Sequence, residues 1–167
     1  MLQIRDLMHG DIQNRELHRI NTVLDEEYSR SRIKPNDIII SLVGTIGKVA
    51  TIPFWLTCAN IHRNLARVRV SKALPRFVFY YLQSSTAKKL IEDKTFGSNQ
   101  PLLNLGDLRN LLTPVPTLEE QRLISNLLDA HFLSIKRQEK YLVQLNILKS
   151  SLMQDLLTGR VRVGCTS

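Results

Sequence analysis

The carboxyl-terminal third of the chain constrains its fold most, because it reads as one unusually long helix. The sequence PVPTLEEQ at residues 114–121 runs into a helix-favouring stretch that ends with LLTG at residues 156–159. The prolines cannot lie inside a helix, Thr117 can cap one, and Gly159 can end one. We therefore predict a single helix over residues 116–158 and a short tail over residues 159–167. At about 1.5 Å per residue this helix would extend about 60 Å.

The apolar residues of this predicted helix repeat every seven positions, in two rows. The rows consist of Leu128, Ile135, Leu142 and Leu156, and of Ile124, Leu145 and Leu152. Such rows are typical of a coiled-coil seam. Polar residues interrupt them at His131, Gln138 and Lys149. These three residues either set the register of a paired helix or mark an imperfect amphipathic helix that packs on its own domain. A helical bundle fits the pattern as well as a two-stranded coil does.

Residues 1–115 carry most of the positive charge. The 167-residue chain has a formal net charge of +8 and a pI of about 9.8. Residues 1–115 contain 16 Lys and Arg against 10 Asp and Glu, whereas residues 116–167 contain 7 against 5. Such an excess favours a polyanionic partner, because each neutralised phosphate releases counterions. The hydrophobic content of 43% is sufficient for one buried core, so we predict a basic globular domain over residues 1–115.

The pattern of residues 1–115 predicts mixed strands and helices. Apolar alternation and β-branched residues favour strands over residues 2–7, 37–43, 48–52 and 64–70. Caps and helical spacing favour helices over residues 22–30, 86–92 and 104–110, and another helix that begins at Pro75. A last strand is expected at Leu111 and Leu112. The predicted fold class is α+β: a small mixed α/β domain followed by one long carboxyl-terminal coiled-coil helix.

Several other classes of protein are excluded by what the sequence lacks. The chain begins without the apolar core of a signal peptide, and no apolar run approaches the roughly twenty residues of a membrane span, so we expect a cytoplasmic protein with no membrane partner. The sequence GTIGKV at residues 44–49 lacks the glycine spacing of a phosphate-binding loop. The four histidines have no metal-binding spacing. We expect no catalytic residues, no metal and no cofactor on this chain.

A series of short motifs resembles a known family in its order and spacing. These motifs are DIIIS at 37–41, GTIGK at 44–48, YYL at 80–82, GSNQ at 97–100, PVP at 114–116, EEQ at 119–121 and LLTG at 156–159. Together they resemble a type I restriction-modification specificity subunit, and the resemblance covers nearly the whole chain. Any one motif is weak, but seven in the family's order are specific.

The resemblance implies a DNA target-recognition domain followed by a helical spacer. In that family two such halves are joined in one chain, and the spacers pair antiparallel; this chain has one half. The implied partners are double-stranded DNA, the methyltransferase subunits and, through them, the restriction subunit. S-adenosylmethionine and ATP would bind those partner subunits. Through its long helix the chain would form a homodimer or pair with another specificity chain.

Base reading would then come from loops that carry hydrogen-bonding groups, with Arg and Lys holding phosphates. The first candidate group lies in residues 94–100 and comprises Lys94, Ser98, Asn99 and Gln100. The second group consists of Thr45, Lys48, Asn60, His62 and Arg63. Arg67, on a predicted strand with one basic face, is expected to contact phosphate. A structural turn in the first group and a solvated surface in the second are the alternatives.

The sequence departs from the family pattern in two places. Asn36 stands where the family usually has Gly, a substitution that still tolerates a turn. The stretch IRDL at residues 4–7 resembles a strand that in the family lies further inside the recognition domain. The resemblance therefore implies that the opening segment of the domain is missing. The alternative function is a truncated cassette that binds protein partners without reading DNA.

Overall fold

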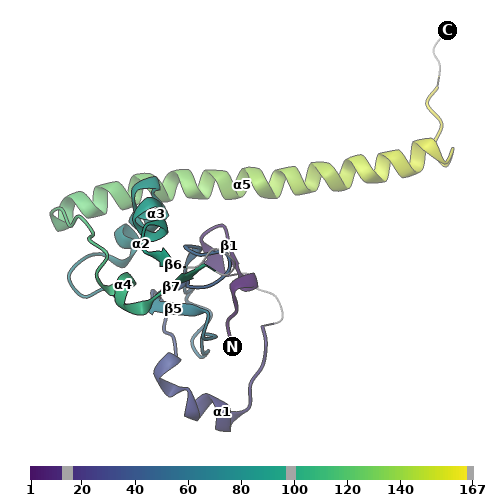
Figure 1. Ribbon diagram of the computed structural model, residues 1–167. Coiled ribbons are helices and arrows are strands. Elements are labelled where there is room, and N and C mark those ends of the chain that lie inside the picture. Colours follow the sequence, from purple (N-terminus) through teal and green to yellow (C-terminus); the bar gives the residue numbers. More distant parts are fainter. Residues whose placement is uncertain (13–16, 97–100, 165–167) are drawn as a thin grey trace. The chain divides into compact units, whose positions relative to one another are not determined.

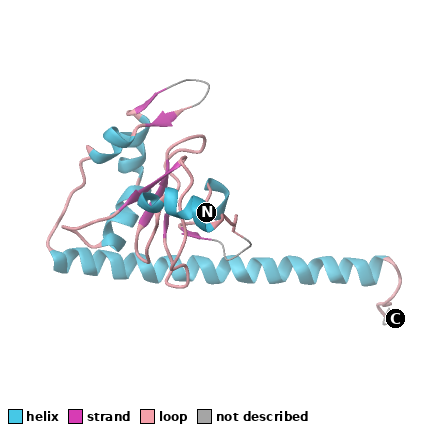
Figure 2. Ribbon diagram, turned by 90° about the horizontal axis from the view of Figure 1, so that it is seen from below, coloured by secondary structure: helices cyan, strands magenta, loops and turns pink. Residues whose placement is uncertain are grey.

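The chain forms two compact units. The computed structural model describes residues 1–12, 17–96 and 101–164. The first unit, Met1–Ser125, contains short strands and helices and is called the globular unit here. The second, Asn126–Ser167, consists mainly of the rest of one long helix and is called the helical unit. Figure 2 shows the helices and strands of both units. The mixed α/β composition and the long carboxyl-terminal helix confirm the predicted fold class.

A three-stranded antiparallel sheet forms the centre of the globular unit. Strand β3 (Ile38–Ser41) lies between β4 (Val49–Thr51) and β5 (Leu65–Val68). Ile38 and Ile40 pack into one hydrophobic cluster, whereas Ile39 packs into a second cluster on the opposite face. Because both faces are covered, β3 needs apolar residues at consecutive positions, which explains its run of isoleucines. The predicted strand–turn–strand hairpin and the third strand are confirmed.

Two consecutive helices pack against the Ile38 and Ile40 face of this sheet. Helix α2 (Pro75–Gln83) begins with proline at its first position, as predicted, and buries Phe77 and Phe79 in the same cluster as these isoleucines. Helix α3 (Ser85–Glu92) follows at once. The side chain of Ser84 caps it by accepting a hydrogen bond from the amide of Ala87 at 3.2 Å.

Smaller elements surround the sheet. They are η1 (Ile4–Asp6), β1 (Leu7–Met8), β2 (Asp11–Ile12), α1 (Thr22–Glu27), η2 (Ser29–Ser31), β6 (Thr95–Phe96), β7 (Leu102–Leu103) and α4 (Leu105–Arg109). β1 pairs with β2, and β6 pairs with β7, in both cases antiparallel. The predicted helices over residues 22–30, 86–92 and 104–110 correspond to α1, α3 and α4, although α1 is shorter than predicted because the η2 turn replaces its end.

Two predicted strands are wrong. Residues 2–7 turn into η1, because the buried carboxylate of Asp6 accepts a hydrogen bond from the amide of Gln3 at 2.8 Å and closes a tight turn. Only Leu7 of that stretch enters a strand. Leu111 and Leu112 adopt no strand, and Leu112 is 85% exposed. A strand needs a partner edge, and the described residues supply none at this position.

The turn before β3 contains a non-glycine residue with a positive φ angle. Asn36 has a φ of +68°, the left-handed conformation that Asn tolerates better than most residues. Next to it, Asp37 is 3% exposed and accepts two hydrogen bonds from the Arg69 guanidinium, at 2.7 and 2.6 Å. These hydrogen bonds raise the pKa of Arg69. Asn36 therefore fulfils the glycine role that the family pattern implied for this position.

Helix α5 (Leu118–Leu157) confirms the long helix expected from the sequence. Figure 1 shows it as one uninterrupted helix, and it contains 40 residues. The Thr117 hydroxyl accepts a hydrogen bond from the amide of Glu120 at 3.3 Å, and Gly159 has a φ of +72° just beyond the end. The local signals at both ends of the stretch were therefore sufficient to predict it.

The first turns of α5, residues 118–125, belong to the globular unit and are fixed there by Gln121. This side chain is 1% exposed. Its amide nitrogen donates to the carbonyl of Pro116 at 2.8 Å, and its amide oxygen accepts from the backbone amide of Leu74 at 2.8 Å. Leu74 is the N-cap residue of α2 and makes no cap with its own side chain. Gln121 therefore joins the start of α5 to the start of α2, which explains the last residue of the EEQ motif.

We predict that Gln121→Ala lowers the free energy of unfolding by about 1–3 kcal/mol, because the amide of Leu74 and the carbonyl of Pro116 lose their partner. Ser125→Ala provides the matched control. Ser125 is also buried on α5, but its hydroxyl has no hydrogen-bond partner among the described residues, so its removal should be neutral or stabilising. Urea unfolding measures both changes. Equal losses in the two variants would contradict this role for Gln121.

The structure corrects one predicted helix-pairing residue. Ile124 lies in the globular unit and packs, half-buried, against the cluster that contains Ile38 and Phe79. It is a core residue rather than part of a seam. In the helical unit, Leu128 is partly buried, and the remaining predicted seam residues are exposed: Ile135, Leu142, Leu145, Leu152 and Leu156. No helix among the described residues is long and apolar enough to cross a membrane.

Candidate nucleic-acid interface

The β3–β4 loop, the segment before β5 and strand β7 meet at the carboxyl end of β3. The amide of Gly47 donates to the carbonyl of Ser41 at 3.1 Å, which closes the β3–β4 loop. Next along the chain, the amide of Leu42 donates to the carbonyl of Asn64 at 2.8 Å, and the carbonyl of Leu42 accepts from the amide of Leu103 at 2.9 Å. We call this region the loop cluster; its described residues are 44–48, 61–64 and those of strands β6 and β7.

The β3–β4 loop is held by one buried hydroxyl. Ser41, which is fully buried, donates its hydroxyl hydrogen to the carbonyl of Thr45 and accepts a hydrogen bond from the amide of Lys48 at 2.9 Å. Gly44 and Gly47 supply the positive φ angles of +73° and +75° that the turn requires. The side chains of Thr45 and Lys48 are consequently exposed on a fixed backbone. This is the arrangement expected of a loop that presents side chains to a ligand.

The segment before β5 contributes one exposed cation. Arg63 is exposed and precedes the hydrogen bond between Asn64 and Leu42. His62 is half-buried, and its Nδ1 atom lies 3.4 Å from the backbone amide of Asn64, which donates to it. Of the two, Arg63 is better placed to contact phosphate, because its side chain is exposed to solvent.

Asn60 does not belong to this interface, contrary to the sequence-based prediction. Its side chain is fully buried. The side-chain oxygen accepts from the Ser31 hydroxyl at 2.9 Å, and the nitrogen donates to the Asp25 carboxylate at 2.6 Å. The same carboxylate accepts a hydrogen bond from Arg32 at 2.6 Å, which raises the pKa of that arginine. Asn60 is therefore a structural residue that joins α1 and η2 to the segment before β5.

The first candidate group is only partly described by the structure. Lys94 is half-buried directly after α3, and its backbone amide donates to the carbonyl of Ile91 at 3.2 Å. Ser98, Asn99 and Gln100 lie outside the described residues. The strands on either side of them, β6 and β7, pair with each other through Phe96 and Leu102. Of the described residues in this region, Leu103 of β7 contacts Leu42 through the hydrogen bond between its amide and the Leu42 carbonyl.

Sequence reasoning missed one basic residue of this region. A cavity of about 340 Å³ separates the β3–β4 loop from the end of α3, and Gly47, Lys88 and Thr95 are among its lining residues. The Lys88 side chain is exposed there. No sequence motif marks Lys88, and its exposure follows from the fold, in which the neighbouring Ala87 faces the core. Its proximity to residues 44–48 depends on tertiary packing.

Arg67 of β5, and Arg69 just after it, do not form the solvated basic face that the sequence predicted for this strand. Arg69 forms an ion pair with Asp37, so its charge is already compensated within the fold. Arg67 is half-buried, and its Nη1 atom donates to the carbonyl of Arg32. Arg67 therefore reaches solvent less freely than Arg63. Among the described parts of the chain, no three His, Cys, Asp or Glu side chains gather in a way that could hold a metal ion.

Comparison with known proteins identifies the family. A family profile described as "Type I restriction modification DNA specificity domain" matches residues 9–145. The chain therefore belongs to the type I restriction-modification DNA specificity family, as its motifs suggested. It is 27% identical over 167 residues to the type I restriction enzyme EcoBI specificity subunit of Escherichia coli, with 96% of this chain and 35% of that protein covered.

Two further relatives come from Methanocaldococcus jannaschii. The chain is 36% identical to the putative type I restriction enzyme MjaX specificity subunit over 147 residues, which cover 86% of this chain and 33% of that protein. It is 30% identical to the MjaVIII specificity subunit over 145 residues, which cover 82% of this chain and 34% of that protein. The chain thus spans about a third of the length of these relatives.

Solved structures share the fold. A chain from a study of complex assembly and conformational transition of the type I restriction-modification system matches with a TM-score of 0.59 and 22% identity. That match covers 90% of this chain and 36% of the other chain. The HsdS subunit of Thermoanaerobacter tengcongensis matches with a TM-score of 0.55 and 23% identity, covering 74% of this chain and 33% of that subunit.

Proposed function

We propose that this chain is a half-length specificity subunit that binds double-stranded DNA through the loop cluster. The observation that carries this proposal is that the β3–β4 loop, the segment before β5 and strand β7 meet at the carboxyl end of β3. Exposed cations lie on these elements and on the adjacent α3: Lys48, Arg63 and Lys88. Cations can hold phosphates, and the polar side chains of the same loops can reach base edges. The family membership of the chain supports a DNA-reading role for these loops.

The helical unit would hold two such readers together. Its exposed apolar residues repeat every seven positions from Ile135 to Leu156. A second copy of this chain offers the same rows, so the two helices can bury them against each other. A twofold dimer would present two identical recognition domains, and such symmetry demands matching half-sites. The expected DNA target is therefore bipartite, with its halves arranged as an inverted repeat. Pairing with another specificity chain is the alternative.

The chemistry of modification and cleavage would reside on partner subunits. In this proposal the chain supplies target selection and performs no catalysis. Methyltransferase subunits would dock on it and bring S-adenosylmethionine, and the restriction subunit would join through them and bring ATP. The expected product is methylated DNA at sites that this chain selects.

The DNA contacts can be tested by removing basic side chains near each end of β3 and comparing the effects on DNA binding. We expect the double variant Lys48→Ala and Arg63→Ala to weaken binding to every duplex, and to lower the slope of log affinity against log salt by about 2, since two phosphate contacts are lost. Lys34→Ala is the matched control. Lys34 is exposed as well, but it precedes the opposite end of β3 and should leave the slope unchanged. Fluorescence anisotropy with a labelled duplex measures the slopes.

Three results separate the proposal from its alternatives. Equal slopes in the double variant and in Lys34→Ala would contradict the assignment of the loop cluster. If the unchanged chain binds no duplex at low salt yet binds a methyltransferase subunit, the interaction-fragment function is correct instead. Mapping methylated adenines after co-expression with that subunit shows whether Asn99→Ala and Gln100→Ala change the selected sequence, as the sequence-based assignment of these residues predicts.

A further inference from the structure

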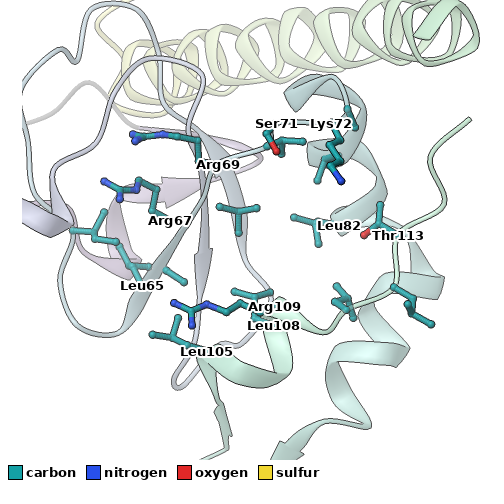
Figure 3. Close-up of a pocket in the computed structure, with 18 of the residues that line it drawn as sticks. Leu65, Arg67, Arg69, Ser71, Lys72, Leu82, Leu105, Leu108, Arg109 and Thr113 are labelled. Atoms are coloured by element: carbon teal, nitrogen blue, oxygen red, sulfur yellow. The ribbon is translucent and has the colours of Figure 1, made fainter. Parts of the chain in front are cut away.

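A large groove opens beside β5, and Ile61 is the one described loop-cluster residue among its lining residues. Its volume is about 1120 Å³, which exceeds that of ordinary small-molecule pockets. Figure 3 shows that β5 lines one side of the groove, and that α2 and the segment after α4 line the other. All of its lining residues lie in the globular unit.

The side of the groove formed by β5 is an unpaired strand edge. In an antiparallel ladder, hydrogen-bonded and non-hydrogen-bonded residue pairs alternate. The hydrogen bond between Leu42 and Asn64 fixes this alternation, so that Ile40 and Ala66 are the next hydrogen-bonded pair. Arg67, one position further, must direct its backbone amide and carbonyl to the outer edge. No described strand pairs with that edge, because β5 is the last strand of the sheet.

The groove combines an apolar floor with a basic rim. Its floor includes the side chains of Ala66, Val78 and Leu82, which are buried. Its charged lining residues are all basic: Arg30, Arg67, Arg69, Lys72 and Arg109. Arg69 is neutralised by Asp37, but Arg30, Lys72 and Arg109 have exposed side chains. No acidic side chain lies among the described lining residues. A polypeptide segment that fills this groove needs apolar side chains toward the floor and acidic side chains toward the rim.

The opposite wall includes a segment that pairs with no described strand. Leu111, Leu112, Thr113 and Val115 line it without belonging to any helix or strand. The sequence of Leu111 and Leu112 favours a strand, but among the described residues no neighbouring strand pairs with them. Both walls of the groove therefore suit an extended occupant that lies along them.

We propose that this groove binds an extended segment of a partner protein, which adds to the outer edge of β5 and carries acidic residues between apolar ones. This mode of recognition uses main-chain hydrogen bonds for affinity and side-chain contacts for specificity. Duplex DNA fits less well, because its phosphates match the rim but nothing in it uses the strand edge or the apolar floor. The inference goes beyond the proposed function and does not require that the loop cluster bind DNA.

The test uses the full 167-residue chain and a fluorescein-labelled peptide of alternating glutamate and valine as the probe. We expect saturable binding, slower hydrogen exchange at the amide of Arg67, and at least about tenfold weaker binding by the double variant Lys72→Glu and Arg109→Glu. The double variant Lys88→Glu and Lys89→Glu makes the same charge change on α3, outside the groove, and should bind the peptide like the unchanged chain.

Modified peptides test the strand edge itself. Two peptides carry N-methyl groups on alternate amides, one on the valines and one on the glutamates. One of the two should bind at least about tenfold more weakly, because only one set of amides faces β5. Equal binding by both peptides would overturn strand addition, and equal loss in the Lys88 and Lys89 variant would overturn the groove as the site. Lack of peptide binding, together with weaker duplex binding by the Lys72 and Arg109 variant, would show a phosphate-binding surface instead.

Discussion

A chain in which Leu142 and Leu145 are both replaced by aspartate is expected to be a monomer at concentrations where the unchanged chain is a dimer. These leucines are 59% and 43% exposed, and they stand in the two rows that the proposed helix pairing would bury. Burying a leucine contributes about 1.5–3 kcal/mol to the free energy of association. Each loss of about 1.4 kcal/mol raises the dissociation constant tenfold, so the loss of two leucines per helix should raise it at least a hundredfold. The introduced carboxylates add a cost for desolvation.

The same experiment includes a control on the opposite side of the helix. At about 100° per residue, Val143 and Ile147 lie away from both rows, and both are exposed. Changing these two residues to aspartate adds the same charge to the helix, yet should leave the dimer intact. Sedimentation equilibrium reports the molar mass, and circular dichroism shows that both variants remain folded. A dimeric Leu142 and Leu145 variant, or monomers in both cases, would contradict the proposed seam.

The second large effect is expected at Arg69. Arg69→Met should lower the free energy of unfolding by about 2–4 kcal/mol, because it leaves the carboxylate of Asp37 buried without its charged partner. We expect a smaller loss of stability than for a fully buried ion pair, because the Arg69 side chain is 49% exposed. Arg67→Met, two residues earlier in the chain, is the matched control. It removes a hydrogen bond to a backbone carbonyl and no ion pair, so we expect a loss of about 1 kcal/mol.

A double variant separates the buried charge from simple loss of packing. Adding Asp37→Asn to Arg69→Met removes the carboxylate charge, and the amide can still accept the hydrogen bond from the backbone of Lys34. We therefore expect the double variant to be more stable than Arg69→Met alone. Chemical denaturation of the four proteins completes the cycle. Strict additivity of the two single changes would show that the pair contributes nothing specific.

Elements with local signals could be predicted from the sequence. Pro75 marks the start of α2, and Thr117 and Gly159 bound α5, because each residue has a conformational preference that acts without help from distant contacts. The run from Ile38 to Ile40 predicts a buried strand for the same reason. The reversal at residues 44–47 depends on two glycines whose positive φ angles are also a local property.

The errors arose where tertiary contacts decide the outcome. Asn60 has the chemistry of a base-reading residue, but the Asp25 carboxylate and the Ser31 hydroxyl, distant in sequence, take up its hydrogen bonds inside the fold. Ile124 fits the sevenfold repeat and still packs in the globular unit, because the helix begins within that unit. The groove beside β5 could not be predicted either, since its walls come from segments far apart in the chain.

The hydroxyl of Ser41 has a consequence for how this protein can diversify. One buried side chain fixes the backbone of the β3–β4 loop from inside, while Thr45 and Lys48 are exposed at its surface. The shape of the loop and the chemical groups that it displays are thus encoded by different residues. Surface substitutions can therefore accumulate over generations, and give descendants new preferences, without any need to rebuild the scaffold that carries them.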